Sequence, residues 1–428
     1  MPDGCGSTSE ELVLAAMKIL WVKANKLFPL HSGGNLRSYH IALRLASRNE
    51  LRFLSYYDGG QDEQYDRLLA QHFPGACAVS TGKSQKLPAC VADYLMKQAD
   101  PAPYAVSRFQ SARVLEKVKT LLATGDFDVA VCDFLDAAVN FPPSTLPVAL
   151  FQHNVESEIW RRHAETEANP IKRWLYGREF RKMLAYERAA VRRFPLVIAV
   201  SDHDKRLMSE WVHNSRITVI PTGVDVSQYR TGGSDRKPTP LVMFVGAMDW
   251  EPNVDAVEFF CRDIWPSVLA KFPQAKFRIV GRNPVRRVQQ YANASIEVTG
   301  RVPAVIDHLR EAAVVVVPLR IGGGTRLKIF EAMATGKAVV STSVGAEGLD
   351  VHDGEDIILA DEAPAFAEAV CRVLSDDEAR KRLEHAAAKL AGSYDWIAVA
   401  SRFETALQHV VRRTIASQDL VSQGTPGR

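Results

Sequence analysis

The chain has 428 residues, of which 46% are hydrophobic and 24% are charged, and its formal net charge at pH 7 is +3. Its length exceeds the size at which one hydrophobic core usually stops growing, so we expect two domains of about 200 residues each. The composition excludes a disordered chain, and the balance of 53 basic against 50 acidic side chains excludes a dedicated nucleic-acid-binding protein.

The N-terminal segment has the features of neither a secretory signal nor a membrane span. Asp3, Glu10 and Glu11 stand where a signal peptide needs positive charge. The apolar run over residues 12–22 is 11 residues long and contains Lys18, which is too short for a span. The six cysteines form no Cys-x-x-Cys pair, which is typical of reduced thiols. We therefore expect a cytoplasmic protein with a flexible tail over residues 1–16 and an alternative start at Met17.

The first half of the chain is predicted to form a parallel α/β domain over residues 17–230. A buried strand over Lys18–Val22 is followed by a loop containing Gly33-Gly34 and by an amphipathic helix. The apolar side chains of this helix are Leu36, Tyr39, Ile41, Leu43 and Leu45. Further short apolar runs predict strands at Val129–Cys132, Val148–Phe151 and Leu196–Val200. Strands that alternate with helices are typical of a parallel sheet.

A second α/β domain is predicted over residues 241–395. Residues 231–240 are rich in turn formers and charges, and we interpret them as the linker between the domains. The strands predicted beyond it are Leu241–Val245, Phe277–Val280, Ile296–Val298, Val314–Val317, Ala338–Val340 and Ile357–Leu359. Residues 396–414 have apolar side chains at helical spacing and are expected to cross back to the first domain, and residues 415–428 are expected to be disordered.

Three glycines follow the predicted strand Val314–Val317 and lead to a helix that is expected to begin near Thr325, a good N-cap residue. Arg326 and Lys328 lie in its first turn, where the helix dipole disfavours cations by about 0.3–1 kcal/mol each. A bound diphosphate would reverse this effect and would accept charge-assisted hydrogen bonds from both cations. The alternative is a glycine turn with a solvated pair between Lys328 and Glu331.

Two further side chains are candidates for contact with a ligand. Glu331 lies one turn beyond the two cations, where a carboxylate can accept hydrogen bonds from vicinal hydroxyls, although a helical Glu is usually only solvated. His153 follows the strand Val148–Phe151, at the edge of the sheet where α/β proteins bind ligands. A lone His is more often a structural hydrogen-bonding residue.

Three other patterns carry weaker signals. Thr81–Ser84 contains the end of a phosphate-binding loop, but Cys77 stands where that motif needs a glycine, so we expect a surface loop. Asp202-His203-Asp204 lies at a predicted helix start, and no metal is expected. Residues 159–193 carry ten basic against four acidic side chains, interleaved with Trp160, Trp174, Tyr176 and Phe180. This stretch fits a surface that rests on an anionic membrane and, equally, an ordinary charged helical face.

The segments Pro318–Gly336 (PLRIGGGTRLKIFEAMATG) and Lys337–Leu349 (KAVVSTSVGAEGL) resemble the donor-site signature of the GT-B glycosyltransferases of family 4. Further segments match this family in the same order: QHNVE at 152–156, IPTGVD at 220–225, FVGAMDWEPN at 244–253, IVGRN at 279–283 and VTGRV at 298–302. The resemblance covers most of residues 17–410, is strongest from 241 to 350, and extends to bacterial exopolysaccharide sugar transferases.

The resemblance implies a GT-B fold, in which two Rossmann-like domains with parallel sheets face a central cleft. It implies that Glu331 binds the ribose hydroxyls and that Arg326 and Lys328 hold the diphosphate of the donor. His153 would lie near the donor sugar, and Gly33-Gly34 would approach the phosphate or the acceptor. The implied donor site comprises Gly322, Gly323, Gly324, Thr325, Glu331, Gly246, Arg282, Arg301 and Val302.

The chain departs from the family pattern in two places. The family commonly has a Glu eight positions before Glu331, where this chain has Gly323, so the usual contact to the sugar hydroxyls is missing there. The family's basic pair after the first strand of the second domain is also missing, because Gly246–Trp250 stands in its place. We expect Arg326 and Lys328 to replace that pair.

The resemblance predicts a retaining glycosyltransferase that moves a sugar from a nucleotide-diphosphate sugar to a glycan or lipid-linked acceptor. The expected process is the biosynthesis of exopolysaccharide or a related cell-surface glycan, without a metal cofactor and without a nucleic-acid partner. The expected location is the cytoplasm, including peripheral contact with the cytoplasmic face of the inner membrane. The alternatives are a nucleotide-sugar epimerase or hydrolase of the same fold, and a non-catalytic nucleotide-sugar-binding protein, which Gly323 makes credible.

Overall fold

The first strand shows why the first sheet is buried on both faces. In the computed structural model, which describes residues 16–30, 32–84, 87–97, 100–167, 169–229, 239–321 and 327–423, strand β1 covers Lys18–Ala24. Ile19 and Trp21 belong to one hydrophobic cluster, whereas Leu20 and Val22 belong to another. Because successive side chains of a strand point to opposite faces, the two clusters lie on the two sides of the sheet.

The first domain contains a seven-stranded parallel sheet in the order β3-β2-β1-β4-β5-β6-β7. The other strands are β2 (Glu50–Tyr57), β3 (Cys77–Ser80), β4 (Val129–Asp133), β5 (Val148–Phe151), β6 (Leu196–Ala199) and β7 (Ile217–Val219). The helices are α1 (Gly33–Ala46), α2 (Glu63–His72), α3 (Leu87–Met96), α4 (Tyr104–Ser107), α5 (Ala112–Ala123), α6 (Glu156–Thr166), α7 (Pro170–Arg193), α8 (Asp202–Ser209) and α9 (Val226–Tyr229), with 3-10 turns η2 (Leu135–Asn140) and η3 (Asn214–Arg216). The predicted strands of this half are confirmed, while β2, β3 and β7 were not predicted.

The second domain contains a six-stranded parallel sheet in the order β10-β9-β8-β11-β12-β13. Its strands are β8 (Leu241–Val245), β9 (Lys276–Val280), β10 (Ile296–Gly300), β11 (Val314–Val317), β12 (Ala338–Ser341) and β13 (Ile358–Leu359). Its helices are α10 (Glu251–Phe259), the π-helical turn η4 (Phe260–Ile264), α11 (Trp265–Lys271), α12 (Arg286–Gln289), α13 (Val305–Glu311), α14 (Leu327–Ala334), α15 (Ala363–Ser375) and α16 (Asp377–Ser393). All six predicted strands are present: β8 and β11 have the predicted ends, and each of the other four shifts by one or two residues at one end.

The chain crosses between the domains twice, and the two crossings lie side by side. The backbone N–H of Val224 donates to Tyr394 O at 2.8 Å, and the N–H of Trp396 donates back to Val224 O at 3.2 Å. Gly223 permits this approach, since a Cβ there would lie 2.5 Å from the Trp396 ring. A substitution at Gly223 would therefore push the two crossings apart. Residues 231–238 of the predicted linker lie outside the described residues.

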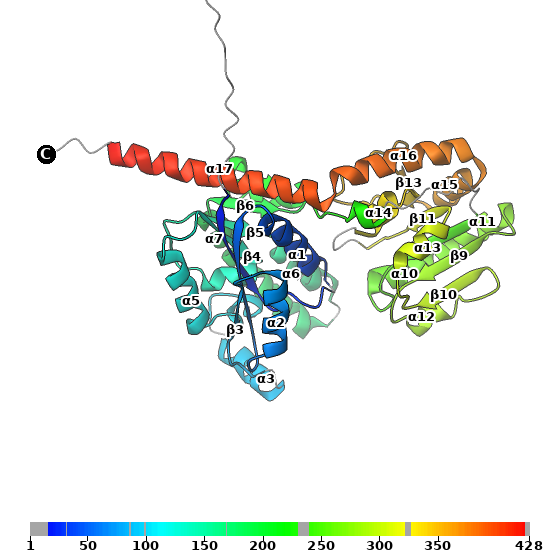
Figure 1. Cartoon of the computed structure of the whole chain (residues 1–428). Helices are drawn as coiled ribbons and strands as arrows, with labels where there is room; N and C mark the ends of the chain where they lie inside the picture. Colours follow the sequence, from blue (N-terminus) through cyan, green and yellow to red (C-terminus); the bar gives the residue numbers. More distant parts are fainter. Residues whose placement is uncertain are drawn as a thin grey trace, which may run out of the picture.

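Helix α17 (Trp396–Gln423) returns to the first domain and covers one face of its sheet, as Figure 1 shows in red. Phe403 stacks on Trp21 of β1 with ring centroids 5.5 Å apart, and Trp396, Phe403 and Leu407 share a cluster with the side chains of β1. The helix continues to Gln423, so the prediction that disorder begins at residue 415 is wrong. Residues 1–15 and 424–428 lie outside the described residues, and within the described part no helix is both long and apolar enough to cross a membrane.

Candidate active site

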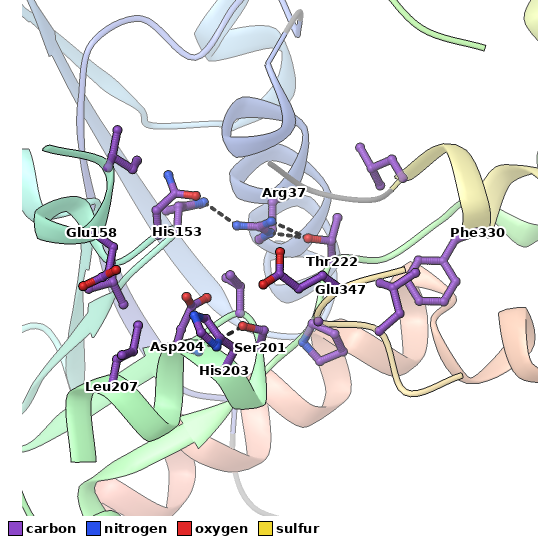
Figure 2. A pocket seen from close by; sticks show the side chains of 18 of the residues that line it. Arg37, His153, Glu158, Ser201, His203, Asp204, Leu207, Thr222, Phe330 and Glu347 are labelled. Carbon is purple, nitrogen blue, oxygen red and sulfur yellow. Dashed lines mark hydrogen bonds between the residues drawn. The ribbon is translucent and has the colours of Figure 1, made fainter. Parts of the chain in front are cut away.

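Residues of both domains line one pocket, which Figure 2 shows from close by. The second domain contributes Leu327 and Phe330 from α14 and a short loop over Glu347–Leu349 that follows β12. The first domain contributes residues from α1, α6 and α8 and from the ends of β5 and β6. The pocket lies beyond the carboxyl ends of parallel strands, where α/β folds bind ligands.

The glycine segment at the start of α14 lies outside the described residues. Gly322, Gly323, Gly324, Thr325 and Arg326 belong to it, and the roles predicted for them stay predictions. The described part of the helix begins at Leu327.

Lys328 lies in the first described turn of α14 and is half-buried. Its Nζ donates to Asn253 Oδ1 at 2.7 Å and lies 4.5 Å from the centroid of the Phe244 ring. Asn253 is itself buried, and its Nδ2 donates to Ala247 O at 2.9 Å. These contacts hold the ammonium group against the end of β8, so it is not the solvated side chain that the alternative interpretation required.

Glu331 is half-buried one turn further along α14. The hydroxyl of Tyr229, at the end of α9, donates to its Oε1 at 3.2 Å. Burial raises the pKa of Glu331, and the bond from Tyr229 and the charge of Lys328 oppose this shift. A carboxylate offers about four acceptor positions, so one bond to Tyr229 leaves capacity for hydroxyl groups of a ligand.

Gly246 lies where the loop after β8 meets neighbouring backbone. A Cβ on Gly246 would lie 2.6 Å from Asn253 Nδ2, and a Cβ on Gly281 would lie 1.6 Å from Gly246 O. Gly246 therefore keeps Asn253 close, and Asn253 in turn holds Lys328. This gives Gly246 a packing role that the donor-site prediction did not include.

The other residues predicted for the donor site lie at the neighbouring strand ends. Arg282 follows β9 and Arg301 follows β10, and both are exposed. Val302 is half-buried and packs against the core of the second domain. Their positions at the carboxyl edge of the sheet are compatible with a ligand site, but no described contact joins them to Lys328 or Glu331.

His153, at the end of β5, is buried and makes hydrogen bonds through both ring nitrogens. Its Nε2 lies 2.7 Å from Asp133 Oδ1, and its Nδ1 lies 3.0 Å from the Arg37 guanidinium. Because the carboxylate accepts and the guanidinium donates, the neutral ring carries its proton on Nε2. Burial lowers the pKa of His153 to about 3, with Arg37 acting in the same direction and Asp133 against it. His153 is therefore neutral at physiological pH.

Asp133 is the centre of a buried polar cluster at the end of β4. Besides the bond from His153, it accepts a hydrogen bond from Trp21 Nε1 at 2.9 Å, and Lys23 Nζ lies 3.5 Å from its carboxylate. Burial raises the pKa of Asp133, but the charge of Lys23 and the hydrogen bond from His153 outweigh this effect and bring the pKa to about 2. The carboxylate thus stays ionised inside the domain.

Arg37, on α1, links His153 to the first crossing between the domains. Its side chain is 0% exposed, and its Nε donates to Thr222 Oγ1 at 2.9 Å. Figure 2 shows Arg37 between His153 and Thr222, with Glu347 of the second domain nearby. Burial lowers the pKa of Arg37 to about 10, so it remains a cation.

Gly33 and Gly34 begin helix α1 instead of lying in a loop before it, so that part of the prediction is wrong. Ser32 is the N-cap, and its hydroxyl accepts from Asn35 N. A Cβ on Gly34 would lie 2.3 Å from Cζ of Phe134, whose ring stacks on His153 at a centroid distance of 3.7 Å. Gly34 therefore makes room for the ring that supports His153.

Gly34→Ala is expected to displace Phe134 and to lower the free energy of unfolding by about 1–3 kcal/mol, the usual cost of overpacking. Any activity of this site is expected to fall as well, because His153 loses its stacking partner. Gly177→Ala is the control, since no atom lies within 4 Å of its Cβ position in α7, and it should gain up to about 1 kcal/mol. Urea unfolding of both variants measures this difference. Equal stability of Gly34→Ala and the wild type would contradict the packing role.

Several residues of the site were not identified from the sequence: Arg37, Asp133, Phe134, Thr222 and Glu347. Asp133 and Phe134 directly follow the apolar run Val129–Cys132, and a polar residue at a strand end was the available signal. Phe134 also has a positive φ of 72°, which no sequence pattern indicated.

Comparisons with known proteins cover both domains. The model of Glycosyltransferase Family 4 matches residues 33–228, and the model of Glycosyl transferases group 1 matches residues 239–376. The phosphatidyl-myo-inositol mannosyltransferase of Mycobacterium tuberculosis is 29% identical over 340 residues, which are 73% of this chain and 83% of that protein. The D-inositol 3-phosphate glycosyltransferase of Corynebacterium efficiens is 25% identical over 241 residues, which are 49% of this chain and 55% of that protein.

Two solved structures share the fold at low sequence identity. Anabaena Alr3699/HepE in complex with UDP has a TM-score of 0.66 and 17% identity, covering 92% of this chain and 100% of that one. Sucrose-phosphate synthase from Thermosynechococcus elongatus has a TM-score of 0.64 and 17% identity, covering 94% and 100%. At this level of identity the likeness shows the two-domain fold alone.

Proposed function

The chain belongs to the glycosyltransferases of family 4 and has their GT-B fold, and from this we propose that it moves a sugar, with retention of configuration, from a nucleotide-diphosphate sugar to a glycan or lipid-linked acceptor. The observation that carries the proposal is that Lys328 and Glu331 lie on the same helix, α14, next to a pocket lined by both domains. A cation and a carboxylate one turn apart suit a diphosphate and the ribose attached to it.

In this proposal the bond from the sugar C1 to the β-phosphate oxygen breaks while a bond from C1 to the acceptor oxygen forms on the same face. The acceptor hydroxyl passes its proton to the departing phosphate, so the step needs no protein base. Lys328 and Arg326 stabilise the negative charge that develops on the leaving group, which is usually the largest catalytic effect in such a site.

His153 is assigned to the sugar side of the pocket. Its pKa near 3 and its bonds to Asp133 and Arg37 favour a neutral group that shapes the site over a proton acceptor. Asp133, Arg37 and Phe134 then act on the reaction by positioning His153.

The acceptor is proposed to be membrane-associated, in the assembly of exopolysaccharide or a related cell-surface glycan. One relative is named for mannosyl transfer to phosphatidyl-myo-inositol, and this favours a lipid acceptor here. The first turn of α7 supports the same idea, because Ile171 and Trp174 are 72% and 61% exposed and flank the exposed cations Lys172 and Arg173. Apolar side chains among cations suit the surface of an anionic membrane.

Trp174→Ala is expected to weaken binding to vesicles of phosphatidylglycerol and phosphatidylethanolamine by about 10-fold, because a buried aromatic side chain contributes about 1.5–3 kcal/mol. Co-sedimentation measures this binding, and vesicles of phosphatidylcholine alone should bind the wild type weakly. Trp250→Ala removes another exposed tryptophan, from the second domain, and should bind like the wild type. Wild-type binding that is equally strong to both kinds of vesicle, or absent from both, would contradict the membrane contact.

The proposed reaction is tested by incubating the whole chain with radiolabelled UDP-, GDP- and ADP-sugars and an extract of bacterial membranes. Transfer of label from one donor into the lipid or glycan fraction is the expected result, and the product's anomeric configuration tests retention. Release of free sugar without transfer would point to a hydrolase, conversion of the donor sugar to an epimerase, and binding without turnover would contradict catalysis.

A further inference from the structure

Hydrogen bonds join the loop after β12 to Val317 and Leu319, at the end of β11 and just after it. Thr342 Oγ1 donates to Leu319 O at 2.5 Å, and Ser341 Oγ donates to Val317 O at 3.2 Å. Gly345 N donates to Thr342 Oγ1 at 2.9 Å, and a Cβ on Gly345 would lie 2.6 Å from Val317 O. These contacts hold the loop against the end of β11.

This position brings Glu347 into the pocket between the domains. Glu347 lines it together with Leu327 and Phe330 of α14 on its own domain. Figure 2 shows its carboxylate directed into the pocket, on the side of Arg37 and Thr222. The next residue, Gly348, has a φ of +81°, and a Cβ there would lie 3.5 Å from Ser201 Cβ of the first domain. The tip of the loop is thus one of the places where the second domain approaches the first.

We infer that Glu347 binds hydroxyl groups of the sugar carried by the nucleotide-diphosphate donor and so contributes to the choice of sugar. The inference rests on the proposed function, which places the diphosphate beside the first turn of α14. Leu327 begins the described part of that helix and lines the same pocket, so a sugar attached to the diphosphate has this pocket as its nearest space. A carboxylate can accept two hydrogen bonds from vicinal hydroxyls of a neutral sugar.

The position of Glu347 distinguishes it from the nucleotide contacts. Glu331 and Lys328 lie on α14 and make bonds to Tyr229 and Asn253, whereas Glu347 comes from another loop and faces the first domain. Loss of its charge should affect the sugar end of the donor and leave the nucleoside diphosphate end unchanged. Its role would also supply a carboxylate for the sugar in a chain that has Gly323 in the glycine segment.

Glu347→Gln tests whether Glu347 acts on the sugar of the donor and not on its nucleotide. Calorimetric titration compares UDP-glucose, UDP-galactose, GDP-mannose and ADP-glucose with free UDP, GDP and ADP. For the nucleotide-sugar that the wild type prefers, we expect Glu347→Gln to weaken binding by about 10-fold, the value of a hydrogen bond to a charged group. Binding of the matching free nucleotide should stay within about twofold. Glu355→Gln, an exposed Glu beyond the pocket, is the matched control and should bind both ligands like the wild type.

The outcomes separate the inference from the proposed function. Equal weakening of nucleotide and nucleotide-sugar, or no weakening of either, would overturn the role of Glu347 while leaving the proposed donor class intact. A wild type that binds neither a nucleotide-sugar nor a free nucleotide would overturn both. Because Glu347 is exposed, its replacement by Gln should leave the melting temperature unchanged, which separates a binding effect from misfolding.

Discussion

Lys328→Ala is expected to lower the kcat of sugar transfer by about 10²- to 10³-fold, the usual cost of removing one group that stabilises charge in a transition state. The ammonium is held by Asn253 and lies over Phe244, so it is positioned before a ligand arrives and needs little reorganisation. In the proposed reaction, negative charge builds on the diphosphate as the sugar leaves. Affinity for the free nucleoside diphosphate should fall too, because part of that charge is present in the ground state.

Two variants separate this electrostatic effect from a loss of packing. Lys328→Met keeps the aliphatic stem over Phe244 and removes only the charge, so it should lose nearly as much activity as Lys328→Ala while folding normally. Lys381→Ala removes an exposed lysine of α16 and should retain full activity. Steady-state kinetics with the preferred donor measure both effects. A decrease in kcat of less than about threefold in Lys328→Met would remove this residue from the catalytic machinery.

The sequence predicted the strands of the second domain well because they are short, continuous apolar runs. β11 consists of four valines, all buried, and β8 is nearly as uniform. β2 was missed because Arg52 and Ser55 interrupt its apolar pattern, and β7 because three residues are too few for a pattern. Such segments become strands through pairing with neighbours that lie far away in the sequence.

The end of α17 shows a different limit. Apolar residues at helical spacing predicted the helix only while one face was buried, and Val410 is the last buried side chain among those described. Beyond it Ile415 is 53% exposed, yet the helix continues because its backbone hydrogen bonds do not need a buried face. Sequence periodicity therefore detects the packed part of a helix and ends before the helix does.

The site residues show a similar limit: local features could be recognised in the sequence, whereas contacts between distant residues could not. Lys328 and Glu331 could be selected as candidates from the sequence, because a helix start and a cation in its first turn are local features. Arg37 bonds to a residue 185 positions away and to another 116 positions away, and no local pattern indicates either contact. The roles predicted for Gly322, Gly323, Gly324, Thr325 and Arg326 remain predictions.

Asp133→Ala is expected to have the largest effect on stability, lowering the free energy of unfolding of the first domain by about 3–5 kcal/mol, the usual cost of breaking a buried ion pair. The change would leave the buried Lys23 ammonium without its nearest carboxylate and Trp21 Nε1 without its acceptor. It would also remove one of the two hydrogen bonds that orient the ring of His153, so activity should fall even where the domain stays folded. Urea unfolding followed by tryptophan fluorescence measures the loss, and Asp126→Ala, in the exposed turn before β4, is the control.

The combination of Lys23→Met with Asp133→Asn tests the cause of this loss. If the unpaired ammonium dominates, removal of both charges should destabilise the domain by less than the sum of the two single changes.

The contribution of Asp133 to stability depends on pH, because its pKa is about 2 in the folded protein, whereas that of an ordinary aspartate in water is 3.8. Its ionised form therefore stabilises the fold fully above the ordinary value, and the contribution is lost as pH falls through about 2. The gap between the wild type and Asp133→Ala should accordingly stay constant from pH 7 to pH 5 and narrow only in stronger acid, and a gap that already closes at pH 5 would contradict an ionised Asp133 as its origin.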